Sequence, residues 1–215
     1  MTKEERLKIM VTPGLTPVIR LDSGDKVPYL LEALAAGGIR TAELTMTMPD
    51  APEILRKNRS RFAGTMLLGM GTVTNPDMAE KSLDAGADFL VSPFPVFDVL
   101  KEAQKAEIPM IMGAFSPYEV FQVSQAGADF VKVFPLNVLG LGYLKDLKGP
   151  LPYVKFFPTG GITLENIPEL FKIGVAGCGV GGALVRKDLI EAEDWSALTA
   201  LTKKFIAAIP QKAAK

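Results

Sequence analysis

The chain has 215 residues, 48% of them hydrophobic, which suits a single α/β barrel with a large core. Lys plus Arg and Asp plus Glu number 24 each, without a long run of one sign, which argues against nucleic acid or an anionic membrane surface as the main partner. The sequence contains no histidine, which excludes Ser–His and Cys–His nucleophile pairs, histidine acid–base catalysis and the usual zinc sites.

The chain begins with a short amphipathic segment. Leu7, Met10 and Val11 have helical spacing among charged residues, so residues 3–12 are expected to form a helix that lies on the barrel. This charged start does not suit a signal peptide, and no apolar segment approaches the roughly 18 residues of a membrane span. The one cysteine, Cys178, excludes an internal disulfide and fits a reducing compartment. We therefore expect a cytoplasmic protein that binds no membrane.

Apolar strand-like segments and amphipathic helical segments alternate along the rest of the chain. The expected strands cover residues 16–21, 42–46, 66–73, 89–93, 110–115, 130–135, 154–158 and 176–180. The expected helices include residues 26–36, 49–57, 76–85, 97–106, 117–126 and 164–173. This pattern predicts a (β/α)8 TIM barrel with an extra N-terminal helix, as one domain over residues 1–215. A doubly wound open sheet is the alternative.

The sixth expected strand carries Lys132 within the apolar sequence Phe-Val-Lys-Val-Phe-Pro. Burial disfavours the charged form of a lysine, and a neutral lysine is a nucleophile that forms Schiff bases with ketones and aldehydes. Alternatively, the methylene groups of Lys132 only pack along apolar surface while its ammonium group stays in water. Lys155, in Val-Lys-Phe-Phe-Pro, has the same offset from its proline as Lys132, and strand parity does not decide between the two lysines.

Glu43 is a second ionisable residue in an expected strand. Reacting groups of α/β barrels lie at the carboxyl ends of the strands and on the loops that follow. If Glu43 faces the barrel interior, burial raises the pKa of its carboxyl while a nearby lysine lowers it, a combination typical of acid–base sites. The alternative is an ion pair with Lys132 or Arg20 that only fills the barrel.

The last two expected strands end in the glycine-rich sequences Pro158-Thr-Gly-Gly-Ile and Gly177-Cys-Gly-Val-Gly-Gly. Glycines let backbone N–H groups approach a phosphate, and the start of a following helix adds a favourable dipole. The loops after strands seven and eight are also the recurrent phosphate site of α/β barrels. These loops are therefore predicted to bind an anionic group.

Five motifs in register resemble those of the 2-keto-3-deoxy-6-phosphogluconate (KDPG) and 4-hydroxy-2-oxoglutarate (KHG) aldolases. The motifs are Glu43-Leu-Thr, Gly69-x-Gly-Thr-Val, Val91-Ser-Pro, Lys132-Val-Phe-Pro and Pro158-Thr-Gly-Gly-Ile, within a match over about residues 17–185. The resemblance implies a class I aldolase, an aldehyde-lyase that needs no metal or organic cofactor. It also implies a homotrimer that acts on a small 2-keto acid, and the glycine-rich loops lead us to expect that this acid carries a phosphate.

The resemblance also implies the roles of single residues. Lys132 would form the Schiff base, Glu43 would transfer protons, and Lys155 would be a supporting residue. Thr72 would hold the carboxylate of the pyruvoyl half, and Arg20 would bind a carboxylate or a phosphate. The predicted substrate-binding residues are Arg20, Thr47, Thr72, Pro93, Phe134, Thr159, Gly160, Gly161, Gly181 and Gly182.

Three positions depart from the pattern of the family. Thr47 stands where many members have an arginine, and Met112-Gly113 replaces a Pro-Gly pair. The segment Gly181-Gly-Ala lacks the expected serine, so backbone amides there would have to hold a phosphate without a hydroxyl contact.

The expected reaction is cleavage of a 2-keto-3-deoxy-6-phospho sugar acid of the KDPG type to pyruvate and an aldehyde such as glyceraldehyde 3-phosphate. One alternative is the same chemistry on a galactonate-derived or unphosphorylated 2-keto acid such as KHG. Another is a phosphate-ligand-binding barrel without turnover, in which Lys132 and Glu43 form a structural ion pair.

Overall fold

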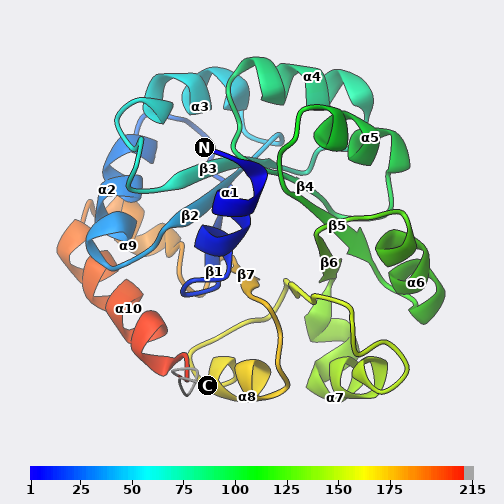
Figure 1. Ribbon diagram of the computed structural model, residues 1–215. Coiled ribbons are helices and arrows are strands. Elements are labelled where there is room, and N and C mark those ends of the chain that lie inside the picture. Colours follow the sequence, from blue (N-terminus) through cyan, green and yellow to red (C-terminus); the bar gives the residue numbers. More distant parts are fainter. Residues whose placement is uncertain (211–215) are drawn as a thin grey trace.

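The computed structural model describes residues 1–210 and shows a curled sheet of parallel strands surrounded by helices (Figure 1). Its seven strands have the order β6-β5-β4-β3-β2-β1-β7. Neighbours in the chain are neighbours in the sheet from β1 to β6, so the doubly wound alternative, whose strand order reverses, is wrong. The strands are β1 (Leu15–Ile19), β2 (Thr41–Thr45), β3 (Leu67–Gly71), β4 (Leu90–Ser92), β5 (Met110–Ala114), β6 (Phe130–Val133) and β7 (Cys178–Val180).

Between β6 and β7 the barrel is closed by an irregular segment. The sequence predicts a strand over residues 154–158, but the structure has only isolated bridges there, such as Val131 with Phe156. The backbone N–H of Gly179 donates to the carbonyl of Pro158 at 2.9 Å. Because Pro158 has no N–H to donate in return, a continuous ladder toward β7 cannot form. The predicted eight-unit barrel therefore has seven regular strands, and β7 is the eighth expected strand.

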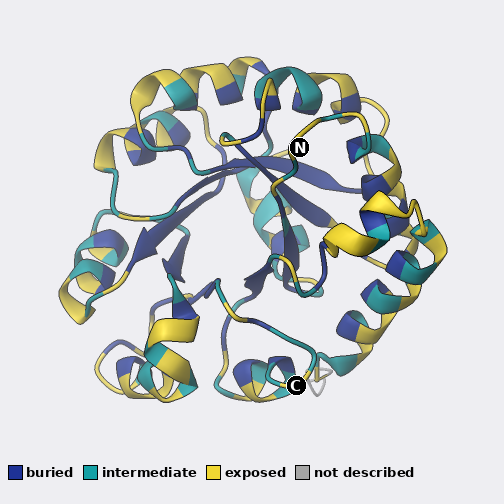
Figure 2. Ribbon diagram, turned by 180° about the vertical axis from the view of Figure 1, so that it is seen from behind, coloured by how far each residue is buried: buried dark blue, intermediate teal, exposed yellow. Residues whose placement is uncertain are grey.

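The helices lie outside the strands, with buried faces toward the sheet and exposed faces outward (Figure 2). Several start as the sequence predicts, since the Asn75 and Ser116 side chains cap α4 and α6 and a proline follows each. The structure adds α7, α9 and α10 to the helices named above. The helices are α2 (Val27–Ala36), α3 (Ala51–Arg59), α4 (Pro76–Asp84), α5 (Phe97–Lys105), α6 (Pro117–Gln125), α7 (Leu136–Lys148), α8 (Ile167–Lys172), α9 (Lys187–Glu191) and α10 (Trp195–Ala208).

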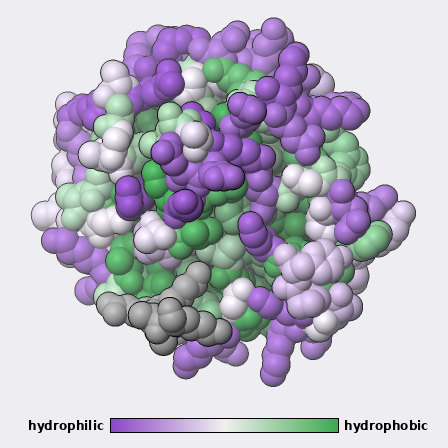
Figure 3. Space-filling model, viewed as in Figure 1, coloured by the Kyte–Doolittle hydropathy of each residue, from purple (hydrophilic) through white to green (hydrophobic). Residues whose placement is uncertain are grey.

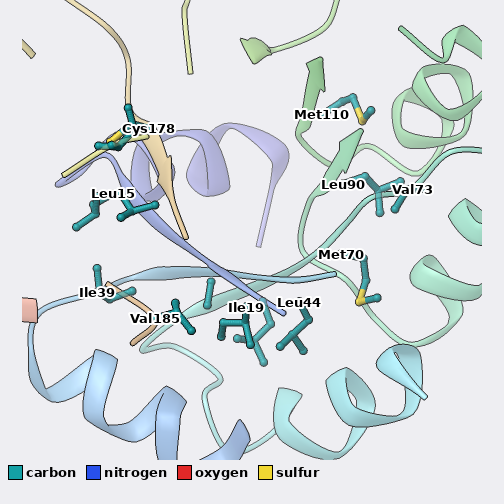
Figure 4. Packing of buried hydrophobic residues seen from close by; sticks show 14 of the residues in the cluster. Leu15, Ile19, Ile39, Leu44, Met70, Val73, Leu90, Met110, Cys178 and Val185 are labelled. Atoms are coloured by element: carbon teal, nitrogen blue, oxygen red, sulfur yellow. The ribbon is translucent and has the colours of Figure 1, made fainter. Parts of the chain in front are cut away.

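Successive residues of each strand point to opposite faces of the sheet, so the apolar side chains form two separate parts of the core. Outward-facing residues such as Ile19, Leu44, Met70, Leu90 and Met110 come from successive strands and pack between the sheet and the helices (Figure 4). A second cluster fills one end of the barrel interior and contains Met10, Leu67, Phe89, Val91, Ile111, Phe130 and Phe157.

Helix α1 (Lys3–Met10) closes that end of the barrel; the predicted helix over residues 3–12 is confirmed, and it ends two residues earlier. Met10 is fully buried in the second cluster, and the salt bridges Lys3–Asp129 and Arg6–Asp88 tie the helix to residues just before β6 and β4. Figure 3 shows this face, where hydrophilic residues predominate around and over a hydrophobic centre. The carboxyl ends of the strands therefore form the open end of the barrel.

Residues 211–215 of the predicted single domain lie outside the described residues, and the domain boundary stays a prediction. Within residues 1–210, none of the helices combines the length and the apolar character that crossing a membrane requires. The expected cytoplasmic location likewise stays a prediction.

Candidate active site

Lys132 lies on β6, and its side chain is directed into the barrel. The residue is only 5% exposed, and its Nζ lies 4.9 Å from the centroid of the Phe134 ring. Its neighbour on β5 is Gly113, which adds no side chain to the space around the amine. Lys155, by contrast, is exposed and belongs to no regular strand. Of the two candidate lysines, Lys132 is the one inside the barrel.

Glu43 lies on β2 and is 3% exposed. Burial raises the pKa of its carboxyl, while the positive charges of Lys132 and Arg20 lower it. These are the opposed influences expected from the sequence, and burial is the largest of them. No salt bridge within 4.0 Å joins Glu43 to Lys132 or Arg20 among residues 1–210, so the structural ion pair considered above does not form. The carboxyl is instead buried within reach of the charges of Lys132 and Arg20.

Glycines make the room that Glu43 occupies. Glu43 pairs with Gly69 on β3, and two residues further along a Cβ atom on Gly71 would overlap the Glu43 carboxylate. On the other side of the barrel, a Cβ atom on Gly113 would overlap the backbone of Pro93. Gly71 therefore leaves the space that the Glu43 carboxylate occupies, and Gly113 lets the backbone at Pro93 approach β5.

A cavity of about 520 Å³ opens at the carboxyl ends of β1, β6 and β7. It brings together seven of the predicted site residues, namely Arg20, Phe134, Thr159, Gly160, Gly161, Gly181 and Gly182. Phe134 connects this cavity to Lys132, because its ring lies beside the amine and also lines the cavity.

The glycine loop after residue 158 is held in a fixed shape. Gly160 and Gly161 have φ angles of 101° and 69°, a left-handed conformation that other residues rarely adopt. The Asn166 side chain donates to the Gly161 carbonyl at 2.7 Å and accepts from the Thr163 amide at 2.8 Å. Within residues 1–210, the N–H groups of Gly160 and Gly161 donate no hydrogen bond, so they are available to an anion.

Three predicted residues lie on other loops of the open end and do not line this cavity. Thr47 is exposed, and its hydroxyl lies 2.9 Å from that of Thr45, which in turn donates to the Ile19 carbonyl. Thr72 is half-buried with a φ of 58°, a strained conformation for a β-branched residue and one that is concentrated at functional sites. Pro93 is half-buried next to Gly113.

Sequence reasoning missed several residues that line the cavity. Lys187 is the most informative of them, because it adds a second cation to the cavity that Arg20 also lines. Its position shortly after the glycines of the last strand was the available signal. The other missed residues are Val18, Ile162, Thr163, Ala183 and Val185.

Neither a metal nor a thiol is suggested by the side chains around this site. Residues 1–210 contain no group of three or more Cys, Asp or Glu residues arranged to hold a metal ion. Cys178 is fully buried on β7, and burial raises the pKa of its thiol, which keeps it protonated and unreactive. Among residues 1–210, Lys132 and Glu43 are the charged residues that are buried.

Comparison with known proteins identifies the family. The model of the family described as KDPG and KHG aldolase matches residues 7–201, which is most of the chain. The chain belongs to the KDPG and KHG aldolase family. As a member of this family it is a class I aldolase and a lyase, and the resemblance inferred from its five motifs is confirmed.

Individual family members align over nearly the whole chain. A 2-dehydro-3-deoxy-phosphogluconate aldolase of Dickeya dadantii is 32% identical over 93% of this chain and 94% of its own. The KHG/KDPG aldolase of Escherichia coli K12 is 31% identical over 92% of this chain and 93% of its own. A crystal structure of KDPG aldolase from Legionella pneumophila, with pyruvate captured as a covalent carbinolamine intermediate, is 34% identical with a TM-score of 0.85, covering 92% of this chain and 96% of that one. The predicted TIM-barrel fold is confirmed by this match.

Proposed function

We propose that this aldolase cleaves a 2-keto-3-deoxy-6-phospho sugar acid of the KDPG type to pyruvate and an aldehyde such as glyceraldehyde 3-phosphate. The observation that carries the proposal is the position of Phe134, which contacts the buried amine of Lys132 and also lines the cavity with Arg20 and the glycine loops. Lys132 and Glu43 do not line the cavity themselves, so the keto acid extends from the cavity past Phe134 to reach the amine, while its other end meets the anion-binding groups.

Lys132 performs the covalent steps. As the neutral amine it attacks the C2 ketone carbon, and loss of water from the carbinolamine gives an iminium ion. The electron pair of the C3–C4 bond moves toward the iminium nitrogen as that bond breaks, which releases the aldehyde and leaves the enamine of pyruvate. Protonation at C3 and hydrolysis of the iminium ion then release pyruvate and restore the amine.

Glu43 transfers the protons, directly or through one water molecule. Its carboxylate accepts the proton of the C4 hydroxyl as the C3–C4 bond breaks, and the resulting acid returns a proton to C3 of the enamine. Because burial raises the pKa of Glu43, the protonated carboxyl persists to higher pH than that of an exposed glutamate. The same group can therefore hold a proton between the two steps.

The remaining predicted residues position the substrate. Thr72 holds the carboxylate of the pyruvoyl half at the end of β3, and Thr47 lies on the neighbouring loop where other members have an arginine. Pro93, Phe134 and Thr159 form the walls. The unpaired amides of the glycine loops receive the phosphate, as backbone N–H groups do in other anion sites.

The substrate assignment is tested by measuring pyruvate release from a panel of 2-keto-3-deoxy acids. The panel contains 2-keto-3-deoxy-6-phosphogluconate, its galactonate epimer, the two unphosphorylated acids and KHG. We expect the highest kcat/KM for a phosphorylated acid. Faster cleavage of an unphosphorylated acid or of KHG would overturn the substrate assignment, and release of pyruvate from none of them would overturn the proposed activity.

We also propose that the chain assembles as a homotrimer through an aromatic surface, defined by the exposed residues Phe94, Phe97, Phe115, Tyr118 and Phe121. Phe94 and Phe115 follow the neighbouring strands β4 and β5, Phe97 begins α5, and Tyr118 and Phe121 lie on α6, so these residues come from two neighbouring strand–helix units. Exposed apolar clusters of this kind mark protein–protein contacts. Light scattering after gel filtration should give the mass of a trimer, and a Tyr118→Glu/Phe121→Glu variant should run as a monomer; a monomeric wild-type protein would contradict the proposal.

A further inference from the structure

We propose that Lys187 selects for phosphorylated substrates by binding the phosphate at the substrate end remote from Lys132. This inference rests on the proposed function and adds a residue that none of the five family motifs contains. Lys187 forms only exposed ion pairs, which a ligand can replace, and within residues 1–210 no acidic residue lines the cavity.

Among the described residues, the charged side chains that line the cavity are all positive. Arg20 and Lys187 are its two charged residues, and no Asp or Glu lines it among the described part of the chain. In a partly enclosed space such a pair of cations attracts an anion more strongly than either cation does on open surface. The cavity is therefore suited to a ligand end with more than one negative charge, as a phosphate has.

The two cations lie at different positions along the cavity. Arg20 is one of the charges that lower the pKa of Glu43, so its guanidinium acts on the reacting centre. Lys187 begins α9, beyond the glycines that follow β7. Of the two cations, Lys187 is the one that follows Gly181 and Gly182 in the chain, and it lines the cavity with them.

Lys187 forms two weak ion pairs. Its Nζ lies 3.3 Å from Asp22 and 3.9 Å from Glu191. The side chains of Lys187, Asp22 and Glu191 are 72%, 95% and 65% exposed, so water and salt screen both pairs. An incoming phosphate offers shorter, charge-assisted hydrogen bonds, and Lys187 can turn to it from Asp22 at little cost.

Lys187 also compensates for a missing side chain. The segment Gly181, Gly182 and Ala183 carries no hydroxyl group to donate to a phosphate. A Cβ atom on Gly181 or Gly182 would meet nothing within 4 Å, so open space adjoins both residues. Their N–H groups donate no hydrogen bond within residues 1–210. The flexible lysine stem is long enough to bring an ammonium group to an anion held by these amides.

The first test compares one variant on two substrates. Lys187→Gln should lower kcat/KM for 2-keto-3-deoxy-6-phosphogluconate by about 10- to 100-fold, mainly through KM, and leave kcat/KM for unphosphorylated 2-keto-3-deoxygluconate unchanged. Lys187→Arg should retain most of the activity on the phosphorylated acid. Lys105→Gln, which removes an exposed charge on α5, is the matched control and should affect neither substrate. Equal losses of Lys187→Gln on both substrates, or no loss on either, would overturn the proposal.

The second test uses the partner of Lys187 and does not need turnover. Calorimetry with inorganic phosphate should show weaker binding to Lys187→Gln and severalfold tighter binding to Asp22→Asn, because the latter variant frees Lys187. In the Lys187→Gln background, Asp22→Asn should have no effect; an equal effect in both backgrounds would contradict the role of Lys187. If the wild-type protein releases pyruvate from no acid, the proposed function fails, while phosphate binding still decides the role of Lys187.

Discussion

Residues 131–135 and 154–158 have almost the same sequence, Val-Lys-Val-Phe-Pro and Val-Lys-Phe-Phe-Pro, but lie at different depths in the barrel wall. Their lysines are 155 − 132 = 23 residues apart, whereas the backbone bridge pairs Val131 with Phe156, a shift of 25. Lys155 therefore lies two residues, roughly 6.6 Å at about 3.3 Å per residue, nearer the amino ends of the strands than Lys132. The same local sequence gives one buried and one exposed lysine because the register differs.

The two depths differ in what surrounds them. At the level of Lys132 the neighbouring strand β5 contributes Gly113, and Gly71 on β3 leaves the space that the Glu43 carboxylate occupies. At the lower level Phe89, Phe130 and the residues around Met10 fill the interior. The upper level can therefore hold a ligand, and the lower level stabilises the barrel. The following predictions test this division, from the largest expected effect to the smallest.

Removing the two lysines should have opposite consequences. Lys132→Ala should lower kcat/KM by on the order of 10⁴-fold or more, because the covalent intermediate cannot form. Lys155→Ala should retain most of the activity, since the residue is exposed and outside the site. Pyruvate release in a coupled assay measures both. Full activity of Lys132→Ala together with an inactive Lys155→Ala would reverse the comparison.

Replacing the carboxyl at the upper level should slow turnover without preventing covalent capture. Glu43→Gln should lower kcat by about 10²- to 10⁴-fold, the usual range for loss of a general acid–base group. Some Schiff base with pyruvate should still form, because Lys132 is intact. Steady-state kinetics and adduct formation are measured on the same preparation, and unchanged turnover would remove Glu43 from the mechanism.

The Glu43→Gln protein should also be at least as stable as the wild type at neutral pH. Burial raises the pKa of Glu43 in the folded state, so the unfolded chain loses this proton first as the pH rises, and stability falls above the ordinary glutamate pKa. Glutamine removes that penalty. Urea unfolding at pH 7.5 therefore serves as the control that separates lost chemistry from lost folding.

Filling the space beside Glu43 should reduce activity less than removing its carboxyl. Gly71→Ala places a methyl group where the carboxylate lies, and a displacement of about 1 Å costs on the order of 10²-fold in rate. The same overpacking should lower the free energy of unfolding by about 1–3 kcal/mol. Gly142→Ala is the matched control, because a Cβ atom there would contact nothing within 4 Å. Equal activity of the two variants would show that space at Gly71 is unimportant.

Truncation at the lower level should affect stability and leave catalysis intact. Met10→Ala removes a fully buried side chain from the cluster under α1 and should cost about 2–5 kcal/mol in the free energy of unfolding. Lys8→Ala, on the exposed side of α1, should cost little. At a temperature where both variants are folded, kcat should equal that of the wild type. A large fall in kcat for Met10→Ala would show that the two levels are coupled.

Local patterns in the sequence predicted the alternation of strands and helices, the N-terminal helix and the burial of Lys132 and Glu43. These features depend on apolar periodicity and on motifs a few residues long. The irregular segment at residues 154–158 was not predicted, because the effect of Pro158 depends on which neighbour its missing N–H would face. The depth of Lys155 and the approach of Lys187 depend on register and on the path of loops, which no local pattern contains.

The central claim is that the amine of Lys132 captures the keto acid, and reductive trapping tests it most directly. The wild-type protein is treated with pyruvate and sodium borohydride, digested, and analysed by mass spectrometry of the peptides that contain Lys132 and Lys155. We predict a reduced pyruvate adduct on Lys132 and none on Lys155, with the adduct absent from Lys132→Ala. An adduct on Lys155 instead, or an unmodified protein, would contradict the account.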